Sequence, residues 1–253
     1  QEYRLEDGKL GKKEKHTQAA SCSGTYTCSP PIVRGSGTEV VRAENLAYTY
    51  TSGERVWQDV WLEVEPGERI VLTGANGTGK STFLRCLCGF LKPEQGSLEL
   101  LGRKPRPGDL IGRVGYMFQN PQRQLFETTV AADIAFTLER LGWDSKSRGK
   151  RVQELLQSCS LADVAEISPY KLSFGQQHLA ALAAVLAPDP KILLLDDPFV
   201  GLDSCKIKDI VQTICELSDK KGMAVLYTDH HEERSFPWSH SRYKFAEGTL
   251  FEE

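Results

Sequence analysis

Hydrophobic and polar residues alternate in two long segments after residue 39. Residues 40–50 (VVRAENLAYTY) and 55–66 (RVWQDVWLEVEP) have the two-residue period of antiparallel strands. Residues 191–196 (KILLLD) are instead mostly apolar, which is typical of a buried strand in a parallel sheet. Further strands are predicted at residues 69–74, 96–102, 111–119 and 223–228, with a closing hairpin near 243–250.

The pattern changes to the helical period between residues 121 and 190. Segments 130–141, 148–161 and 174–187 have this period, with no strand between them, and another helix is expected at about 204–219. Strands that alternate with helices indicate a largely parallel sheet with crossover helices. The predicted fold class is therefore α/β, with a mainly parallel core sheet, an antiparallel β subdomain at its edge and an inserted helical lobe.

The N-terminal region differs in composition from the rest. Residues 11–38 are polar and read as a linker, so the folded domain is predicted to span residues 39–253. The segment YRLEDGKL at 3–10 repeats the pattern of YKFAEGTL at 243–250, and both suit a hairpin with a turn at Gly. Residues 1–10 are thus expected to be the last hairpin of a preceding, similar domain, although coincidence between two short hairpins is the alternative. The absence of an initiator Met before Gln1 also favours a fragment or a processed product.

The bulk composition excludes some classes of function. The chain has 253 residues, of which 40% are hydrophobic, and its net charge of −3 gives no basic field for nucleic acid. Its longest apolar run, residues 179–187, is far shorter than the ~20 residues that span a bilayer. Among seven cysteines, Cys22 and Cys28 are predicted to be free thiols. The others lie in expected helices, as buried small residues of a reducing compartment would: Cys86, Cys88, Cys159, Cys205 and Cys215.

The strongest chemical signal is the segment GANGTGKST at residues 74–82. It fits the pattern G-x-x-x-x-G-K-[ST], in which backbone N–H groups of a Gly-rich turn converge on the phosphates of a nucleotide. Lys80 adds a cation, and the Ser81 hydroxyl is placed to bind Mg²⁺. The turn is expected between a strand and a helix that starts near Gly79, whose N-terminus faces the anion. The predicted nucleotide-binding residues here are Gly74, Ala75, Asn76, Gly77, Thr78, Gly79, Lys80, Ser81 and Thr82.

Two acidic residues end the buried strand at residues 192–197 (ILLLDD). A parallel strand delivers its last side chains to the carboxyl edge of the sheet, beside the predicted phosphate loop. Asp196 is therefore a candidate to hold Mg²⁺, and Asp197 to orient or deprotonate an attacking water. A strand that ends in a solvated acidic turn is the alternative.

Together these segments resemble the ATP-binding domain of ABC ATPases over residues 39–253. The order of motifs carries the resemblance: residues 74–82 like Walker A, FQNP (118–121) like the Q-loop, LSFGQ (172–176) like the signature, LLLDDP (193–198) like Walker B and GLD (201–203) like the D-loop. The resemblance implies that Tyr50 stacks on adenine, with an ordinary strand aromatic as the alternative. It also implies that Gln119 contacts Mg²⁺ and the attacking water.

The resemblance also implies partners. Two such domains meet head to tail, so the signature residues Ser173, Phe174, Gly175 and Gln176 are expected to serve ATP held by a second ABC ATPase domain. Residues 118–136 (FQNPQRQLFETTVAADIAF) look like the ATPases of energy-coupling-factor importers of vitamins and of transition-metal ions such as cobalt and nickel. That implies a transmembrane coupling subunit, a substrate-binding membrane subunit and a peripheral position on the cytoplasmic face of the membrane. A generic Q-loop of another importer is the alternative.

Three positions depart from the family pattern. Phe174 replaces the usual Gly, Asp197 stands where a catalytic Glu is usual, and Asp229 separates Thr228 from the histidines. A one-residue shift of the loop makes His230 the expected switch histidine. The alternatives are His231, or that both histidines are exposed residues at the start of a helix. These departures leave open a half that mainly holds ATP, or an ATP-binding domain without turnover. A soluble ABC ATPase outside transport is a further alternative. Such proteins need basic surfaces or long helical insertions, and this chain has a negative net charge and a short insertion.

Overall fold

The computed structural model describes residues 3–6, 9–12, 39–230 and 238–253, the first two segments through their backbone alone. The strands are β1 (Tyr3–Glu6), β2 (Lys9–Lys12), β3 (Val41–Thr49), β4 (Arg55–Val64), β5 (Arg69–Thr73), β6 (Gln95–Leu100), β7 (Val114–Met117), β8 (Ile192–Leu195), β9 (Ala224–Thr228), β10 (Ser241–Ala246) and β11 (Thr249–Glu252). The helices are α1 (Lys80–Leu87), α2 (Pro107–Leu110), α3 (Val130–Arg140), α4 (Ser145–Ser158), α5 (Phe174–Leu186) and α6 (Ser204–Lys221), with 3-10 turns η1 (Pro121–Arg123), η2 (Ala162–Val164) and η3 (Pro169–Lys171).

The main sheet has the strand order β11-β10-β5-β9-β8-β7, and only β11 is antiparallel to its neighbour. This confirms the predicted, mainly parallel core. Because the strands are parallel, the chain leaves β5, β9, β8 and β7 at one and the same edge of the sheet. The register pairs Leu72 with Thr228, Tyr227 with Leu195, and Leu195 with Met117, so the segments after these four strands begin side by side.

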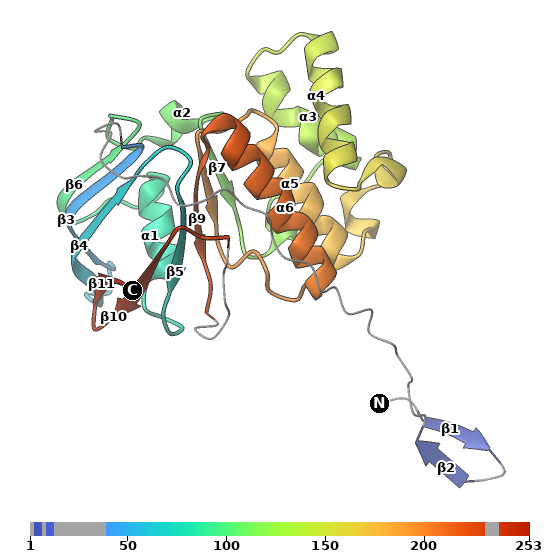
Figure 1. Cartoon of the computed structure of the whole chain (residues 1–253), viewed down its shortest axis with the longest axis horizontal. Coiled ribbons are helices and arrows are strands. Elements are labelled where there is room, and N and C mark those ends of the chain that lie inside the picture. The colour runs from blue at the N-terminus through green and yellow to red at the C-terminus, as the bar shows by residue number, and fades with distance from the viewer. Residues whose placement is uncertain (1–2, 7–8, 13–38, 231–237) are drawn as a thin grey trace.

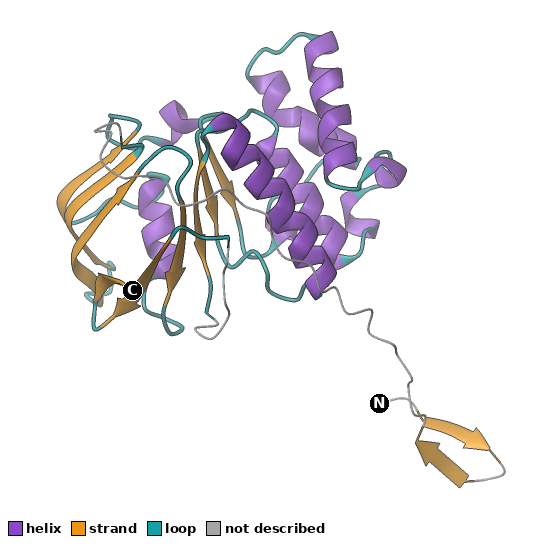
Figure 2. Cartoon of the chain, in the orientation of Figure 1, coloured by secondary structure: helices purple, strands orange, loops and turns teal. Residues whose placement is uncertain are grey.

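Both faces of this sheet are covered, as the apolar strands require. On one face, side chains such as Val71, Leu193 and Val225 pack with α5, α6 and the helical lobe. On the other face, their neighbours Ile70 and Leu194 pack with α1 and the second sheet. Figures 1 and 2 show α1 between the two sheets and the pair α5 and α6 on the far side of the main sheet.

The second sheet is antiparallel, with the order β4-β3-β6. It confirms the predicted antiparallel subdomain and shows that residues 95–100 belong to it rather than to the core. Strand β4 alternates buried and exposed positions, with Trp57 and Val60 facing inward. The second sheet places Tyr50, the residue that follows β3, close to α1.

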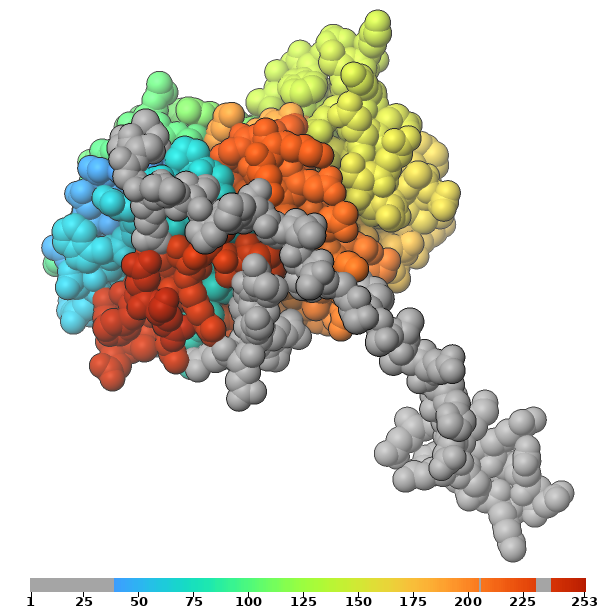
Figure 3. Space-filling view, viewed as in Figure 1, coloured from blue at the N-terminus to red at the C-terminus, as the bar shows by residue number. Residues whose placement is uncertain are grey.

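The helical lobe lies between β7 and β8, and no strand interrupts it among the described residues of that segment. Helix α4 begins at Ser145, earlier than the pattern suggested, because Asp144 Oδ1 accepts the N–H groups of Lys146 and Ser147 as an N-cap. In the space-filling view the lobe, from yellow-green to yellow, projects beyond the orange surface of α6 (Figure 3).

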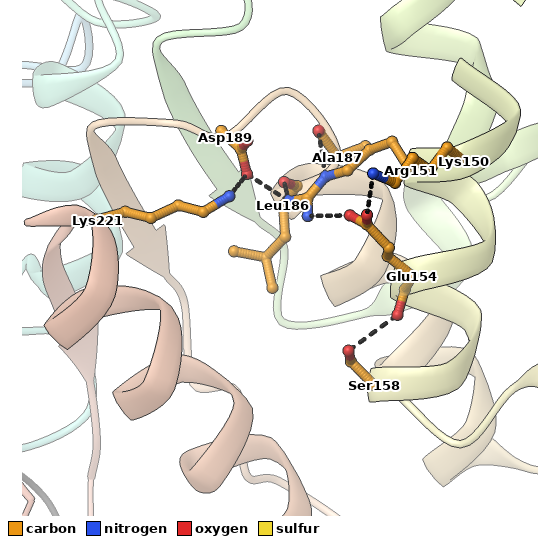
Figure 4. A network of polar contacts seen from close by, with 8 residues as sticks. All are labelled: Lys150, Arg151, Glu154, Ser158, Leu186, Ala187, Asp189 and Lys221. Atoms are coloured by element: carbon orange, nitrogen blue, oxygen red, sulfur yellow. Dashed lines mark hydrogen bonds and ion pairs between the residues drawn. The ribbon is translucent and has the colours of Figure 1, made fainter. Parts of the chain in front are cut away.

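Arg151 of α4 joins the lobe to the end of α5, as Figure 4 shows. Its side chain is nearly buried, and it donates hydrogen bonds to the carbonyl oxygens of Leu186 at 3.0 Å and Ala187 at 3.1 Å. It also pairs with Asp189, which in turn binds Lys221 of α6. A cation thus satisfies the last carbonyls of α5, where the helix dipole favours positive charge.

The hairpin β1–β2 pairs Tyr3 with Lys12 and Leu5 with Leu10. The hairpin β10–β11 pairs Tyr243 with Glu252 and Phe245 with Leu250, which is the same register. The two hairpins therefore share their strand register as well as their sequence pattern. The predicted linker at 11–38 starts too early, because Gly11 and Lys12 belong to β2, and residues 13–38 lie outside the described residues.

The cysteine predictions have mixed outcomes. Cys86, Cys88 and Cys159 are buried free thiols, and burial raises the pKa of each to about 12. Cys215 is buried, as predicted, but it is disulfide-bonded, which the expected reducing compartment does not explain. Cys22, Cys28 and the side chain of Cys205 lie outside the described residues.

Candidate functional site: a phosphate loop beside two aspartates

The loop at residues 74–82 joins β5 to α1, as predicted. Gly79 is the N-cap of α1 with φ 95°, and a Cβ there would lie 2.4 Å from Val56 Cγ1. At Gly74, with φ 132°, a Cβ would lie 2.5 Å from the carbonyl oxygen of Phe245. Only glycine fits these two positions, because both the backbone and the space exclude a side chain.

Lys80 and the start of α1 form an anion site. The buried ammonium of Lys80 donates to the carbonyl oxygens of Gly74 at 2.6 Å and Ala75 at 3.0 Å, which holds it inside the loop. The first N–H groups of any helix have no acceptor within the helix, and Gly79 offers no side chain to cap them. A cation, a helix N-terminus and left-handed glycines at 74, 77 and 79 fit the phosphates of a nucleotide.

Ser81 and Asp196 meet beside this loop. Ser81 Oγ donates to Asp196 Oδ1 at 2.7 Å, and Tyr116 Oη donates to Asp196 Oδ2 at 3.2 Å. Burial and, after it, the nearby Asp196 carboxylate raise the pKa of Tyr116, so this phenol stays a donor. Hydroxyl and carboxylate oxygens are the ligands that Mg²⁺ prefers, and these two residues fit the ion in the predicted place.

Gln119 follows β7 at the same edge of the sheet. The preceding Met117 accepts the N–H of Asp196 at 3.0 Å, which fixes the two segments next to each other. The side chain of Gln119 is exposed and, within the described residues, makes no hydrogen bond to Ser81 or Asp196. The structure therefore brings Gln119 to the edge but leaves its side chain free to turn.

Asp197 lies close to His230. Its carboxylate Oδ1 is 3.6 Å from His230 Nδ1, and both line a cavity of about 110 Å³ with Asp229 and residues 199–202. Asp197 has a left-handed backbone with φ 46°, and its N–H donates to Thr228 Oγ1 at 2.7 Å. The extra residue Asp229 does not keep His230 away from Asp197. His231 lies outside the described residues.

Tyr50 also reaches the phosphate loop. Its hydroxyl lies 2.6 Å from Thr82 Oγ1, and its ring packs edge-on against Tyr48 at 5.3 Å between centroids. The residue is 39% exposed. Its contact with a bound base stays a prediction.

The signature residues lie at the N-terminus of α5. Ser173 caps the helix and exchanges hydrogen bonds with Gln176 in a capping box. The Phe174 ring is 4.5 Å from the ring of His178, and a Cβ on Gly201 would lie 2.9 Å from it. Gly175 faces Leu202 and Lys206, so the signature packs against the segment that follows Walker B. No described contact joins residues 173–176 to the phosphate loop of the same chain.

The sequence reasoning missed four site residues. Tyr116 and Thr228 bind Asp196, and Asp229 lines the Asp197 cavity. A polar residue that ends a buried strand next to Walker B is a signal that could have found Thr228. Asp133 is the fourth. It lies in the first turn of α3, where acidic residues are common, so nothing in the sequence marks its burial.

Asp133 of α3 lines a hollow of about 260 Å³ between the main sheet and the helical lobe. Its Oδ1 accepts the N–H groups of Phe126 at 3.1 Å and Glu127 at 3.2 Å, whereas Oδ2 is buried without a described partner. Burial raises the pKa of Asp133, and the two N–H groups oppose that rise. Exposed Ile111 and Phe126 flank the hollow, which thus combines apolar walls with one incompletely satisfied acid.

These features define a nucleoside-triphosphate-binding protein of the P-loop class: a phosphate loop between a buried strand and a helix, with a Ser–Asp pair at the same sheet edge. The sequence profile of the ABC transporter family matches residues 57–200. The chain belongs to this family as an ATP-binding domain, and it is an ABC ATPase, which couples ATP hydrolysis to transport.

Three of the similar proteins illustrate the relationship. The energy-coupling factor transporter ATP-binding protein EcfA2 of Clostridium acetobutylicum is 34% identical over 204 residues, which cover 76% of this chain and 71% of that protein. The putative ABC transporter ATP-binding protein BL0043 of Bifidobacterium longum is 36% identical over 78% of this chain, which spans only 27% of that longer relative. The structure of cbiO1 from Clostridium perfringens, described as part of the ABC transporter complex cbiONQ, matches with a TM-score of 0.78 and 26% identity over 85% of this chain and 87% of that one.

Proposed function

We propose that this chain is the ATP-hydrolysing subunit of an energy-coupling-factor importer and acts as one half of a two-ATPase module. The similarity to EcfA2, which extends over most of that relative's length, supports the energy-coupling-factor type of importer. No helix among the described residues is long and apolar enough to cross a membrane. The cargo class, a vitamin or a transition-metal ion, follows from the resemblance of residues 118–136.

In this proposal Lys80 and the N–H groups of residues 77–82 bind the phosphates of ATP, and Tyr50 stacks on its base. Ser81, Asp196 and Gln119 hold Mg²⁺. When bound there, Mg²⁺ would supply positive charge to the phosphate oxygens. The contact between Ser81 and Asp196 supports this assignment, because it places two hard oxygen donors next to the phosphate loop.

Asp197 orients the attacking water and accepts its proton as the bond between the terminal phosphorus and its bridging oxygen breaks. Water adds to the phosphorus, ADP leaves and inorganic phosphate forms. His230 lies within reach of the same small cavity and is suited to bind the terminal phosphate. The 3.6 Å separation between Asp197 Oδ1 and His230 Nδ1 supports a joint role of the two side chains at this cavity.

Ser173, Phe174, Gly175 and Gln176 serve ATP that a second ABC ATPase domain holds. The exposed start of α5 supports this role, because the positive end of the helix dipole lies there and the Ser173 cap occupies only the N–H of Gln176. The identical register of β1–β2 and β10–β11 supports a tandem arrangement, in which the second domain precedes residue 10 in the same protein. The gene should then encode another phosphate loop upstream, and a reading frame that starts near Gln1 would rule the tandem arrangement out.

The hollow at Asp133 is the proposed docking site of the transmembrane coupling subunit. Its apolar walls fit the apolar face of a short helix, and the buried Oδ2 fits one basic side chain on that helix. A cationic partner satisfies an acid that the chain alone leaves incompletely paired. This docking places the chain on the cytoplasmic face of the membrane as a peripheral subunit.

The test is to co-express the chain with the coupling subunit from the same genome and to measure how much of each remains in the purified complex. Asp133→Asn should lower the affinity for the coupling subunit at least tenfold without changing the affinity for Mg²⁺–ATP. Asp163→Asn, at an exposed acid of the same lobe, is the matched control and should retain binding. Equal binding by Asp133→Asn and the control would contradict the docking site.

A catalytically weak half is the second candidate, and the departures at Asp197 and Phe174 favour it. The Asp carboxylate is set back by about 1.5 Å, one carbon–carbon bond, relative to Glu. If this reach limits the rate, Asp197→Glu should raise ATP turnover in the assembled module. A lower rate for Asp197→Glu would exclude the short side chain as the cause of weak activity.

A further inference from the structure

Thr228 ends β9, the strand between the phosphate-loop strand β5 and the Walker B strand β8. Its side chain is fully buried, and its backbone pairs with Leu72 in β5. The residue therefore stands at the centre of the sheet edge that carries the site. A buried hydroxyl at this point needs polar partners, and the two aspartates supply them.

The Thr228 hydroxyl contacts both acids. Its oxygen accepts the N–H of Asp197 at 2.7 Å and lies 3.2 Å from Asp196 Oδ1 and 3.4 Å from Asp197 Oδ1. A hydroxyl has one hydrogen to donate, so it serves one carboxylate at a time. Asp196 Oδ1 already receives the shorter hydrogen bond of Ser81, at 2.7 Å. Asp197 has no second described hydroxyl donor.

The same hydroxyl holds a strained backbone. Asp197 has φ 46°, a left-handed conformation that is unfavourable for an L-residue. The hydrogen bond from its N–H to Thr228 offsets that cost and fixes the direction in which the carboxylate leaves the chain. Because Thr is branched at Cβ, its rotamer is stiff and the oxygen stays in place.

We propose that Thr228 is a positioning residue for ATP hydrolysis: its hydroxyl holds the backbone and carboxylate of Asp197 in the geometry that orients the attacking water. This inference rests on the proposed role of Asp197. It goes beyond that role because it proposes that Thr228, on another strand, determines where the short side chain of Asp197 places its carboxylate. Misplacing a catalytic group by ~1 Å can cost on the order of a hundredfold in rate.

The experiment compares Thr228→Val, which keeps the shape but loses the hydroxyl, with Thr228→Ser, which keeps the hydroxyl. Steady-state phosphate release is measured in the assembled two-domain module with the other site disabled, and Mg²⁺–ATP affinity is measured by calorimetry. Thr73→Val is the matched control, because Thr73 is also fully buried at a strand end and donates to the carbonyl of Tyr243 instead.

Thr228→Val should lower kcat at least tenfold and leave the dissociation constant for Mg²⁺–ATP within about twofold, while Thr228→Ser stays within about threefold of wild type. Hydrogen exchange of the Asp197 amide should become faster in Thr228→Val alone. Equal losses in Thr228→Val and Thr228→Ser, or an unchanged kcat in Thr228→Val, would overturn the inference. If Thr228→Val does not fold, Thr228→Ala takes its place in the same comparison.

A double-mutant cycle with Asp197→Asn separates this inference from the function on which it rests. If Thr228 acts through Asp197, Thr228→Val costs less than about twofold in the Asp197→Asn background. The same loss in both backgrounds overturns the role of Thr228 and leaves that of Asp197 intact. Normal turnover by Asp197→Asn alone instead overturns the proposed role of Asp197.

Discussion

Three polar side chains of the site are held in place by neighbouring groups. The ammonium of Lys80 is fixed by two loop carbonyls, Asp196 accepts hydrogen bonds from the hydroxyls of Ser81 and Tyr116, and the backbone of Asp197 is held by Thr228. A group that is already in place loses little entropy when a ligand arrives. These residues therefore contribute to binding and catalysis through their fixed positions as well as their charges.

Lys80→Ala should weaken binding of Mg²⁺–ATP at least tenfold, because it removes the cation from the phosphate site. Isothermal titration calorimetry on the purified chain measures this affinity. Lys92→Ala changes a lysine beyond the end of α1 and serves as the control with unchanged affinity. Unaltered binding by Lys80→Ala would contradict the assignment of the phosphate loop.

His178 should make stability depend on pH. Burial lowers the pKa of this imidazole, while its hydrogen bond to the Phe174 carbonyl opposes the shift. The unfolded chain takes up the proton near its normal pKa of about 6.5 and the native state does so less readily, so stability is lost as the pH falls through that range. His178→Phe should therefore lose less free energy of unfolding between pH 7.5 and pH 5.5, as measured by urea denaturation. An identical pH dependence in both proteins would show that His178 titrates freely.

At the scale of elements, the regular pattern of the chain predicts most of the fold. Strands such as residues 192–195 and helices such as residues 174–186 follow from local periodicity, because burial of one or both faces fixes the spacing of apolar residues. The assignment of β6 to the second sheet depends on pairing between distant segments, which no local pattern records. The same holds for Asp133, whose role comes from a hollow between two parts of the chain.

The motifs of the site were predictable because the chemistry demands particular residues at fixed spacing, as in residues 74–82 and 196–197. Thr228 and Tyr116 act through neighbouring strands, so their partners depend on the register of the sheet. The roles of His230 and Phe174 depend on loop geometry that the sequence left open. The local sequence pattern thus predicts the residues that would contact the nucleotide and the metal ion. The residues that hold them in place become visible only through tertiary contacts.

Arg151→Met should destabilise the chain by on the order of 2 kcal/mol, because it leaves two buried carbonyls at the end of α5 without their donor. Chemical denaturation measures this difference. Lys150→Met is the matched control, since the neighbouring lysine is 81% exposed and its ion pair with Glu154 is long, at 3.9 Å. Equal stability of the two variants would show that the C-terminal cap of α5 contributes little.

At the scale of the whole molecule, one edge of the main sheet carries three segments of the candidate site. The phosphate loop, the acids after β8 and the segment after β7 lie together, and that last segment leads into the lobe that carries the Asp133 hollow and the signature helix. Gln124 links the two regions, because its amide donates to the Ala181 carbonyl of α5 at 3.3 Å and its oxygen accepts the N–H of Phe118. The proposed ATP site and the proposed docking site are thus connected through a few hydrogen bonds.

The most direct test of this account is the rate of phosphate release by the assembled two-domain module whose other ATP site is disabled. The account predicts measurable turnover by the wild-type chain and a loss of at least tenfold in Asp197→Asn, with Mg²⁺–ATP affinity unchanged. Asn tolerates the left-handed backbone as well as Asp does, so the variant removes the charge without forcing a new loop conformation. Turnover by Asp197→Asn that equals the wild-type rate would contradict the claim that this site hydrolyses ATP through Asp197.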